Sequence, residues 1–133
     1  MIIKDRERQL IINHAEDNYP YECCGVLLGN VKNHEVSGIV ANDNDDPDDI
    51  RDIHFSIDPL KLLKLERFAK EKGLDIVGFY HSHNDHPAIP SKEDEKHMIP
   101  GLLYVIAGVR EGEFAELKCY TRASFDDKVV AIS

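Results

Sequence analysis

The feature that most constrains this chain is an uninterrupted apolar run, Ile76 to Tyr80, that passes directly into His81-Ser82-His83. The run has the length and the β-branched and aromatic character of a buried strand. Side chains two residues apart on a strand point to the same face, so His81 and His83 project in parallel. Their Cα atoms would lie about 6.6 Å apart at about 3.3 Å per residue. Two imidazoles at that separation can converge on one ion, and with a nearby carboxylate they suit zinc.

Helix signals occur in three places. A first helix is expected over residues 5–17 with Asp5 as its N-cap, and its apolar face is Ile3, Leu10 and Ile11. A second helix is expected over residues 59–72, between a proline and a glycine. Its predicted core face is Leu62, Leu65 and Ala69. Further apolar side chains predict that it packs on more than one side, namely Leu60, Leu63 and Phe68. A short third helix is expected over residues 91–97.

Strand signals fill most of the remaining chain. The expected strands are residues 26–28, 35–41, 53–56, 76–80, 102–109, 114–121 and 129–132. The first two are expected to form a hairpin. This order of helices and strands predicts an α/β fold in which a mixed β-sheet is flanked by helices.

Length and charge restrict what the chain can do. A length of 133 residues predicts a single domain over residues 1–133. The formal net charge is -9, from 25 acidic and 16 basic residues, which argues against a nucleic-acid partner and fits a basic or weakly charged protein substrate better. The sequence has no signal peptide and no apolar stretch of membrane-spanning length, so no membrane partner is expected. Three cysteines without a framework pattern favour a reducing compartment, and a cytoplasmic location is expected.

An acidic segment lies over residues 43–52 and holds six aspartates and a proline. The composition predicts a solvated surface loop. A calcium-binding loop does not fit, because the segment offers no alignment to the D-x-[DN]-x-[DN]-G pattern with a later Glu.

Two segments together resemble the JAMM (MPN-plus) metalloprotease family. The family pattern P-x-E-x-C-G-x-L-x-G is matched by Pro20, Glu22, Cys24, Gly25, Leu27 and Gly29. The downstream pattern H-x-H-x7-S-x2-D is matched by His81, His83, Ser91 and Asp94. Phe79 stands where the family usually has Trp, and Asn84 stands where proline commonly follows the second histidine. The resemblance extends over essentially the whole chain.

The resemblance implies a JAMM/MPN fold of the cytidine-deaminase-like type and a zinc-dependent hydrolysis of amide bonds. By it, His81, His83 and Asp94 hold one Zn²⁺ per chain with a water in the fourth position. Glu22 takes the proton of that water and delivers it to the leaving amine, and Ser91 hydrogen-bonds the developing oxyanion. The implied activity is that of a zinc metallopeptidase.

The compact chain resembles the prokaryotic stand-alone members of that family. The implied partner is a ubiquitin-like or sulfur-carrier protein with a C-terminal Gly-Gly tail. The tail is expected to lie along an exposed sheet edge beside the zinc, held by main-chain hydrogen bonds. The acidic loop over residues 43–52 is available to a basic surface of such a carrier.

Several other interpretations compete with this one. Ser91 and Asp94 also match a helix capping box. The sequence from His81 to His86 spells H-x-H-x-D-H, the signature of metallo-β-lactamase-like hydrolases, but few residues follow in which their further ligands could lie. Cys23 and Cys24 raise the possibility of a thiol nucleophile, although small buried residues are commoner. A zinc deaminase is excluded because the sequence has no C-x-x-C.

A non-catalytic MPN interaction scaffold is the remaining alternative. It is disfavoured because every expected metal and catalytic residue is present. Among the other histidines, His86 is expected to touch substrate or the groups behind the metal ligands. The rest are interpreted as ordinary polar residues, namely His14, His34, His54 and His97.

Overall fold

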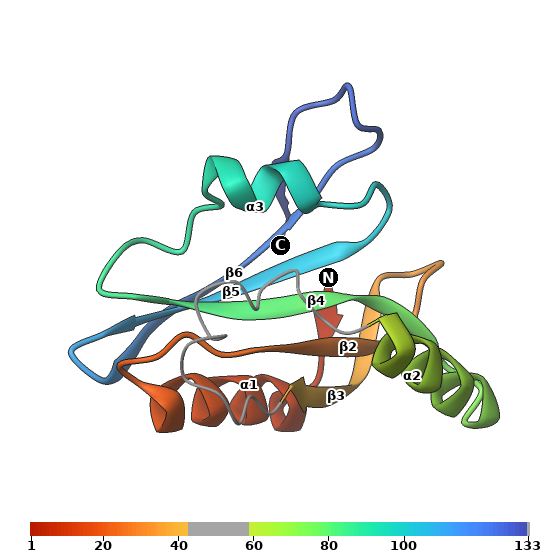
Figure 1. Ribbon diagram of the computed structural model, residues 1–133, viewed down its shortest axis with the longest axis horizontal. Coiled ribbons are helices and arrows are strands. Elements are labelled where there is room, and N and C mark those ends of the chain that lie inside the picture. The colour runs from red at the N-terminus through yellow and green to blue at the C-terminus, as the bar shows by residue number, and fades with distance from the viewer. Residues whose placement is uncertain (43–58, 133) are drawn as a thin grey trace.

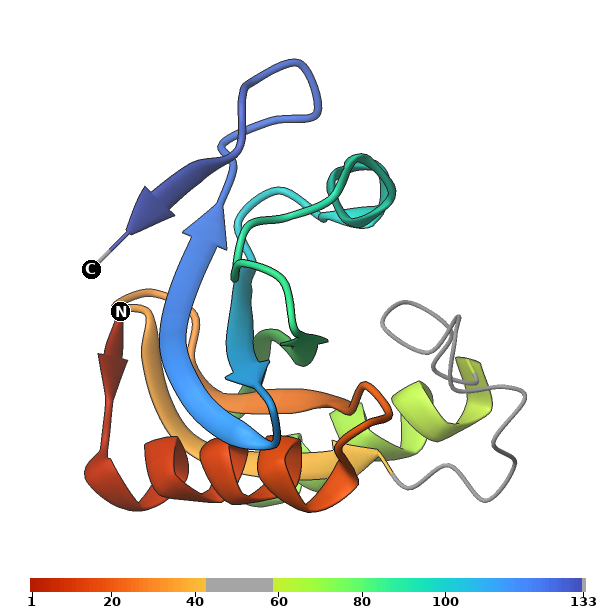
Figure 2. The ribbon, with the colours of Figure 1, turned by 90° about the vertical axis from the view of Figure 1, so that its left-hand side faces the viewer.

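The computed structural model describes residues 1–42 and 59–132, which contain a curled sheet of seven strands and three helices (Figures 1 and 2). The predicted loop 43–52 and the predicted strand 53–56 lie outside the described residues. The strand order is β1-β3-β2-β4-β5-β6-β7. The strands are β1 (Ile2–Ile3), β2 (Cys24–Asn30), β3 (Glu35–Asn42), β4 (Asp75–Asn84), β5 (Leu103–Arg110), β6 (Glu113–Thr121) and β7 (Val130–Ile132). The helices are α1 (Asp5–Asn18), α2 (Pro59–Glu71) and α3 (Lys92–His97).

The predicted mixed α/β sheet and the predicted hairpin are both confirmed. β2 and β3 pair antiparallel, and β4 pairs antiparallel with β2 and parallel with β5. The short β1 was not predicted, because it has only two residues. It pairs with β3, although α1 and β2 lie between the two strands in the sequence. β4 therefore occupies the middle of the sheet, where the apolar run Ile76 to Tyr80 is covered on both faces.

One face of the sheet is covered by α1. Ile11 and Ala15 are fully buried there among side chains of β2, β4 and β5, including Tyr80. The prediction is wrong for two residues of this helix. Lys4 is the N-cap and Asp5 is the first helical residue. Leu10 is 40 % exposed, because the helix buries the face that carries Ile11 and Ala15, and Leu10 lies off that face.

The opposite face carries α2 and α3, and Figure 1 shows α1 and α3 on opposite sides of the strands. Ala69 of α2 is buried against β2. The predicted packing of α2 on a second side is wrong, because the three side chains concerned are 44 to 59 % exposed, namely Leu60, Leu63 and Phe68. Within the described residues, no helix has both the length and the apolar character needed to cross a membrane.

The face that a side chain of β4 occupies follows from its position in the strand. Tyr80 points toward α1, where its hydroxyl lies 2.8 Å from His14 Nδ1. Phe79 packs on the opposite face with the residues beneath α3. Because side chains alternate along a strand, His81 and His83 share the face of Phe79 and α3. β4 continues to Asn84, so both histidines lie within the strand.

Candidate metal centre

His81, His83 and Asp94 bring one ligand atom each to a common point. The two Nε2 atoms of the histidines lie 3.1 Å apart. Oδ2 of Asp94 lies 3.2 Å from Nε2 of His83 and 3.4 Å from Nε2 of His81. All three side chains are at most 4 % exposed. The structure thus joins the end of β4 to α3 through three buried polar groups. The strand spacing predicted that His81 and His83 converge, and the family resemblance implied Asp94.

This triangle has the dimensions that a tetrahedral metal ion requires. Ligand atoms that lie 2.0–2.1 Å from a tetrahedral zinc are about 3.3 Å from one another. The three observed separations, between 3.1 and 3.4 Å, bracket that value. Two imidazoles and a carboxylate are also a donor set of the kind that catalytic zinc sites use. The residues therefore fit a zinc ion.

The orientation of the His83 ring is fixed by its other nitrogen. Nδ1 lies 2.9 Å from the carbonyl oxygen of Pro87. A carbonyl can only accept, so Nδ1 carries the hydrogen of the neutral ring, and Nε2 is then the nitrogen that can bind a metal. A backbone carbonyl behind the ligand is the usual device that sets the tautomer of a metal-binding histidine.

The side chain of Asp94 is held by the start of its own helix. Oδ2 accepts a 2.9 Å hydrogen bond from the Ser91 amide, and the Asp94 amide donates a 2.9 Å bond to Ser91 Oγ. This is a complete capping box, so the capping interpretation of Ser91 and Asp94 is confirmed. It does not compete with the metal-site interpretation, because the capped oxygen is the same one that faces the two histidines.

Burial and hydrogen bonding oppose one another at the centre. Burial alone would raise the pKa of Asp94, but the hydrogen bonds from His81 and His83 outweigh it and hold the pKa well below the usual range. Burial lowers the pKa of His83, yet the bonds to Asp94 and the Pro87 carbonyl leave that pKa raised overall. Both shifts favour an ionised Asp94 beside a protonated His83, so a metal ion that binds here displaces a proton from Nε2 of His83.

Glu22 lies at the rim of the centre, in the segment that leads into β2. Its Oε1 is 3.5 Å from Nε2 of His86, and its side chain is 29 % exposed. The His86 ring stacks over His83 with ring centroids 4.2 Å apart. The expectation that His86 contacts groups behind the metal ligands agrees with this position. Glu22 is also one of the charges that raise the pKa of His83.

The segment that carries Glu22 is tied to β4 by backbone and side-chain bonds. Two hydrogen bonds join Cys23 and Ser82. The Ser82 amide donates to the Cys23 carbonyl at 3.0 Å, and the Cys23 amide donates to Ser82 Oγ at 2.8 Å. Asn84 donates a 3.0 Å bond from Nδ2 to the Pro20 carbonyl. A proline at position 84 could not make that last contact, so the departure from the family pattern adds an anchor here.

Asp85 has a structural role that sequence reasoning missed. Its φ is +61°, and its carboxylate accepts bonds from Tyr19 Oη at 2.7 Å and from the Glu111 amide at 2.8 Å. Both oxygens are thus used away from the two histidines. The metallo-β-lactamase-like interpretation, which needs Asp85 and His86 as ligands, finds no support in this arrangement. Only the positive φ of an aspartate could have been suspected from sequence.

The cysteine alternative does not fit the structure. Cys23, Cys24 and Cys119 are buried, and none of the three forms a disulfide. Burial raises the pKa of the Cys23 thiol to about 12. A nucleophilic cysteine requires the opposite, a lowered pKa and an accessible sulfur.

Among the described strands, β4 offers a Gly-Gly tail no free edge at the two histidines. β4 is hydrogen-bonded on both sides, to β2 and to β5. The ends of the strand order are β1 and β7, which are not the strands that carry the metal ligands. Within the described strands, the edge that the tail would use is therefore not an edge of β4.

Comparison with known proteins agrees with the site. The family model described as prokaryotic homologs of the JAB domain matches residues 5–122. A desampylase of Haloferax volcanii is 31 % identical over 110 residues, covering 74 % of this chain and 73 % of that protein. A probable TtuB-protein conjugate cleaving protease of Thermus thermophilus is 34 % identical over 95 residues, covering 71 % of this chain and 61 % of the relative.

A solved structure supports the fold independently of sequence. The crystal structure of AF2198, a JAB1/MPN domain protein from Archaeoglobus fulgidus, superposes with a TM-score of 0.61 at 17 % identity. The match covers 98 % of this chain and 94 % of that one. The predicted JAMM/MPN fold is therefore confirmed.

Proposed function

The chain belongs to the prokaryotic JAB (JAMM) domain family of metalloproteases, and from that premise we propose that it hydrolyses an amide bond at the C-terminal Gly-Gly tail of a ubiquitin-like or sulfur-carrier protein, using one zinc ion per chain. The observation that carries the proposal is the buried triangle of His81, His83 and Asp94. The names of the two relatives, a desampylase and a TtuB-conjugate cleaving protease, support this class of substrate.

The metal would be held by His81 Nε2, His83 Nε2 and Asp94 Oδ2. A zinc ion with three protein ligands keeps a fourth position for water and brings the pKa of that water toward about 7. Glu22 accepts the proton of the attacking water and passes it to the leaving amine. Its 3.5 Å pairing with His86 keeps the carboxylate at the rim of the centre.

Ser91 stabilises the oxyanion that develops on the scissile carbonyl. In the capping box its oxygen accepts from the Asp94 amide, which leaves the hydroxyl hydrogen available as a donor. A preorganised donor of this kind contributes about 2.7 to 4 kcal/mol in enzymes where it has been removed. Residues 1–133 act as one domain in this proposal. A cytoplasmic location is included because the three cysteines are thiols and not disulfides, as a reducing compartment favours.

The first test is metal content. We expect one zinc per chain in the purified protein, no retained zinc in Asp94→Ala, and retained zinc in Asp85→Ala, because only Asp94 faces the histidines. Mass spectrometry under native conditions and elemental analysis measure the zinc content of the wild type and of each variant. If Asp85→Ala released the metal and Asp94→Ala kept it, the ligand assignment would be wrong. A wild-type chain that does not bind zinc would favour the non-catalytic scaffold.

The second test is substrate cleavage by the zinc-loaded protein. Three substrates are compared by mass spectrometry, namely a Gly-Gly carrier joined to cysteine, the same carrier joined to a lysine side chain, and lysine-linked diubiquitin. We expect a carrier adduct to be cleaved. Glu22→Gln should keep zinc and stability but lose about 1,000-fold or more of turnover, since an amide cannot accept the proton. Cleavage of diubiquitin alone would overturn the carrier assignment.

A further inference from the structure

The peptide group between Pro87 and Ala88 is held at both of its polar atoms. The Pro87 carbonyl accepts the 2.9 Å bond from Nδ1 of His83. The Ala88 amide donates a 2.9 Å bond to Oε1 of Glu116, which lies on β6. One planar peptide therefore stands between a carboxylate and a buried imidazole, with its N–H directed at the first and its C=O at the second.

The position of Glu116 follows from the register of three strands. His83 of β4 pairs with Gly108 of β5, and Gly108 pairs with Glu116 of β6. The three residues therefore form one row across the sheet and share the face that carries the metal centre. Sequence patterns do not reveal this row, because the pairing spans 33 residues of chain between His83 and Glu116.

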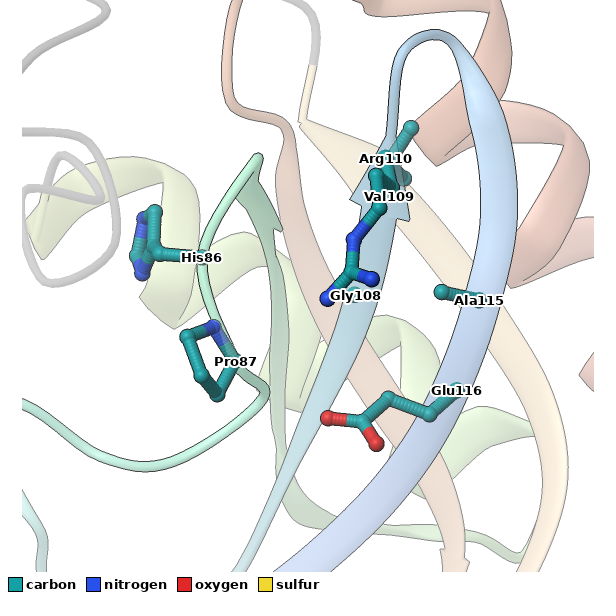
Figure 3. Close-up of a pocket in the computed structure, with 7 residues that line it drawn as sticks. All are labelled: His86, Pro87, Gly108, Val109, Arg110, Ala115 and Glu116. Atoms are coloured by element: carbon teal, nitrogen blue, oxygen red, sulfur yellow. The ribbon is translucent and has the colours of Figure 1, made fainter.

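Gly108 leaves the space that the Glu116 side chain needs. A Cβ at position 108 would lie 3.1 Å from Glu116 Cγ and 3.5 Å from Ala88 Cβ. Because Gly108 has no Cβ, a cavity of about 210 Å³ remains between β5, β6 and the loop that joins β4 to α3. Pro87 of this loop lines the cavity. Figure 3 shows the Glu116 carboxylate directed from β6 across this cavity toward the loop.

Tyr120 fixes the same loop from a second point on β6. Its hydroxyl donates a 2.6 Å bond to the Ala88 carbonyl. Tyr120 is 8 % exposed and packs with Ala88 in the cluster beneath α3. The loop segment behind His83 is thus held by a carboxylate at one end of Ala88 and by a phenol at the other.

We propose that Glu116 is a positioning residue for the metal centre, which acts on His83 through the Pro87–Ala88 peptide. A carboxylate that accepts from the N–H of a peptide polarises its C=O, and a more negative carbonyl makes a stronger acceptor for Nδ1–H. The imidazole is then held in the tautomer that presents Nε2, and its strength as a ligand increases. Carboxylate partners of metal-binding histidines act in this way by direct contact. Here one peptide group lies between them. The inference rests on the proposed function, since it presupposes a metal at His83.

The test measures zinc affinity by competition with a chromophoric chelator at fixed pH. Four variants are compared with the wild type, namely Glu116→Ala, Glu116→Gln, Tyr120→Phe and Glu113→Gln. Glu113 is the matched control, because it is an exposed glutamate on the same strand. We expect Glu116→Ala to weaken zinc binding about tenfold or more, within the range of about 10- to 100-fold seen when such outer partners are removed.

Glu116→Gln separates charge from shape. It keeps an oxygen that accepts from the Ala88 amide but removes the negative charge, so we expect a loss of about threefold, intermediate between the wild type and Glu116→Ala. Tyr120→Phe holds the loop less firmly without changing the carboxylate and should lose less than Glu116→Ala. ¹⁵N resonances of His83 in the zinc-loaded protein should shift in Glu116→Gln and not in Glu113→Gln.

The outcomes distinguish this inference from the proposed function. A wild type that binds no zinc overturns both. A wild type that binds zinc, with both Glu116 variants within twofold of Glu113→Gln, overturns the role of Glu116 alone. Glu116→Gln with wild-type affinity and unshifted His83 resonances also overturns it, because the charge is then unused. If Glu116→Ala does not fold, Glu116→Gln and Tyr120→Phe decide the question, with the melting temperature of the zinc-free proteins as the check on folding.

Discussion

Oδ2 of Asp94 takes part in two interactions at once. It accepts a 2.9 Å hydrogen bond from the Ser91 amide, and it lies 3.2 Å from Nε2 of His83 and 3.4 Å from Nε2 of His81. The helix cap therefore fixes the carboxylate in the direction that the metal requires. Ser91 in turn serves both the cap and the oxyanion, so its replacement has to be analysed in two parts.

Ser91→Ala should lose both contributions, and Ser91→Thr should lose neither. The cap is worth about 1 kcal/mol of stability, because alanine cannot accept from the Asp94 amide. Loss of the oxyanion donor should lower kcat about 100-fold, less than Glu22→Gln does, with KM little changed. Threonine keeps a hydroxyl that can do both. Steady-state kinetics and urea unfolding measure the two effects, and a kcat for Ser91→Ala within threefold of wild type would contradict the oxyanion role.

The three thiols should be inert in the folded protein and should link stability to alkaline pH. Burial raises the pKa of Cys23 to about 12 and that of Cys119 to about 11. A group whose pKa is raised on folding stabilises fully below its unfolded value of about 9, and this stabilisation declines as pH rises toward the folded value. A thiol reagent at pH 8 should therefore react slowly with the native chain. In guanidinium, where the chain is unfolded, it should react with all three thiols. One rapidly reacting thiol in the native chain would contradict this.

The parallel projection of His81 and His83 was predictable from strand geometry, whereas Asp94 was added by the resemblance to the family pattern. His81 and His83 are two residues apart on a strand, and Ser91 and Asp94 are three apart at a helix start. The groups behind them were not predictable. The Pro87 carbonyl, Asp85 and Glu116 act through hydrogen bonds between backbone and distant side chains, and such bonds leave no spacing in the sequence.

At the scale of the elements, strand order depends on close approach at glycines. A Cβ on Gly78 of β4 would lie 1.9 Å from the carbonyl oxygen of Leu103, so the paired strand would have to move. Gly38 of β3 is the matched control, because a Cβ there would lie 3.9 Å from its nearest neighbour, the Leu28 Cβ. We expect Gly78→Ala to cost about 3 kcal/mol or more and Gly38→Ala to stay within about 0.5 kcal/mol in urea unfolding. Equal effects of the two substitutions would contradict this account of β4–β5 pairing.

The helices show where the apolar pattern was sufficient and where it was not. Ile11 and Ala69 occupy the buried faces that their spacing predicted. Leu60, Leu63 and Phe68 satisfied the same pattern but are exposed, since spacing cannot tell which of two apolar faces packs on the sheet. β1 escaped prediction because two residues carry no periodic signal.

At the scale of the whole molecule, the proposed zinc site joins β4, in the middle of the sheet, to the short helix α3. β4 belongs to a sheet that is hydrogen-bonded on both sides. α3 has six residues, and Met98, which follows it, lies in a buried cluster with side chains of β5 and β6. Two hydrogen bonds add to this contact, from the Ile99 amide to the Tyr104 hydroxyl and from Arg122 to the Glu95 carbonyl. A ligand from each part implies that metal binding stabilises α3 and the loop before it more than it stabilises the sheet.

Removal of zinc should therefore loosen the protein locally. Binding at about 1,000 times Kd contributes about 4 kcal/mol to the state that holds the metal, and this contribution is lost from the elements that need the metal to stay in place. Hydrogen exchange followed by mass spectrometry should show faster exchange in residues 85–98 after chelation, with β3 and β6 unchanged, because neither strand pairs with β4, which carries the two histidines. Asp94→Ala should show the same pattern with or without zinc. Uniform acceleration across the sheet, or none in residues 85–98, would show that the metal does not hold α3 to β4.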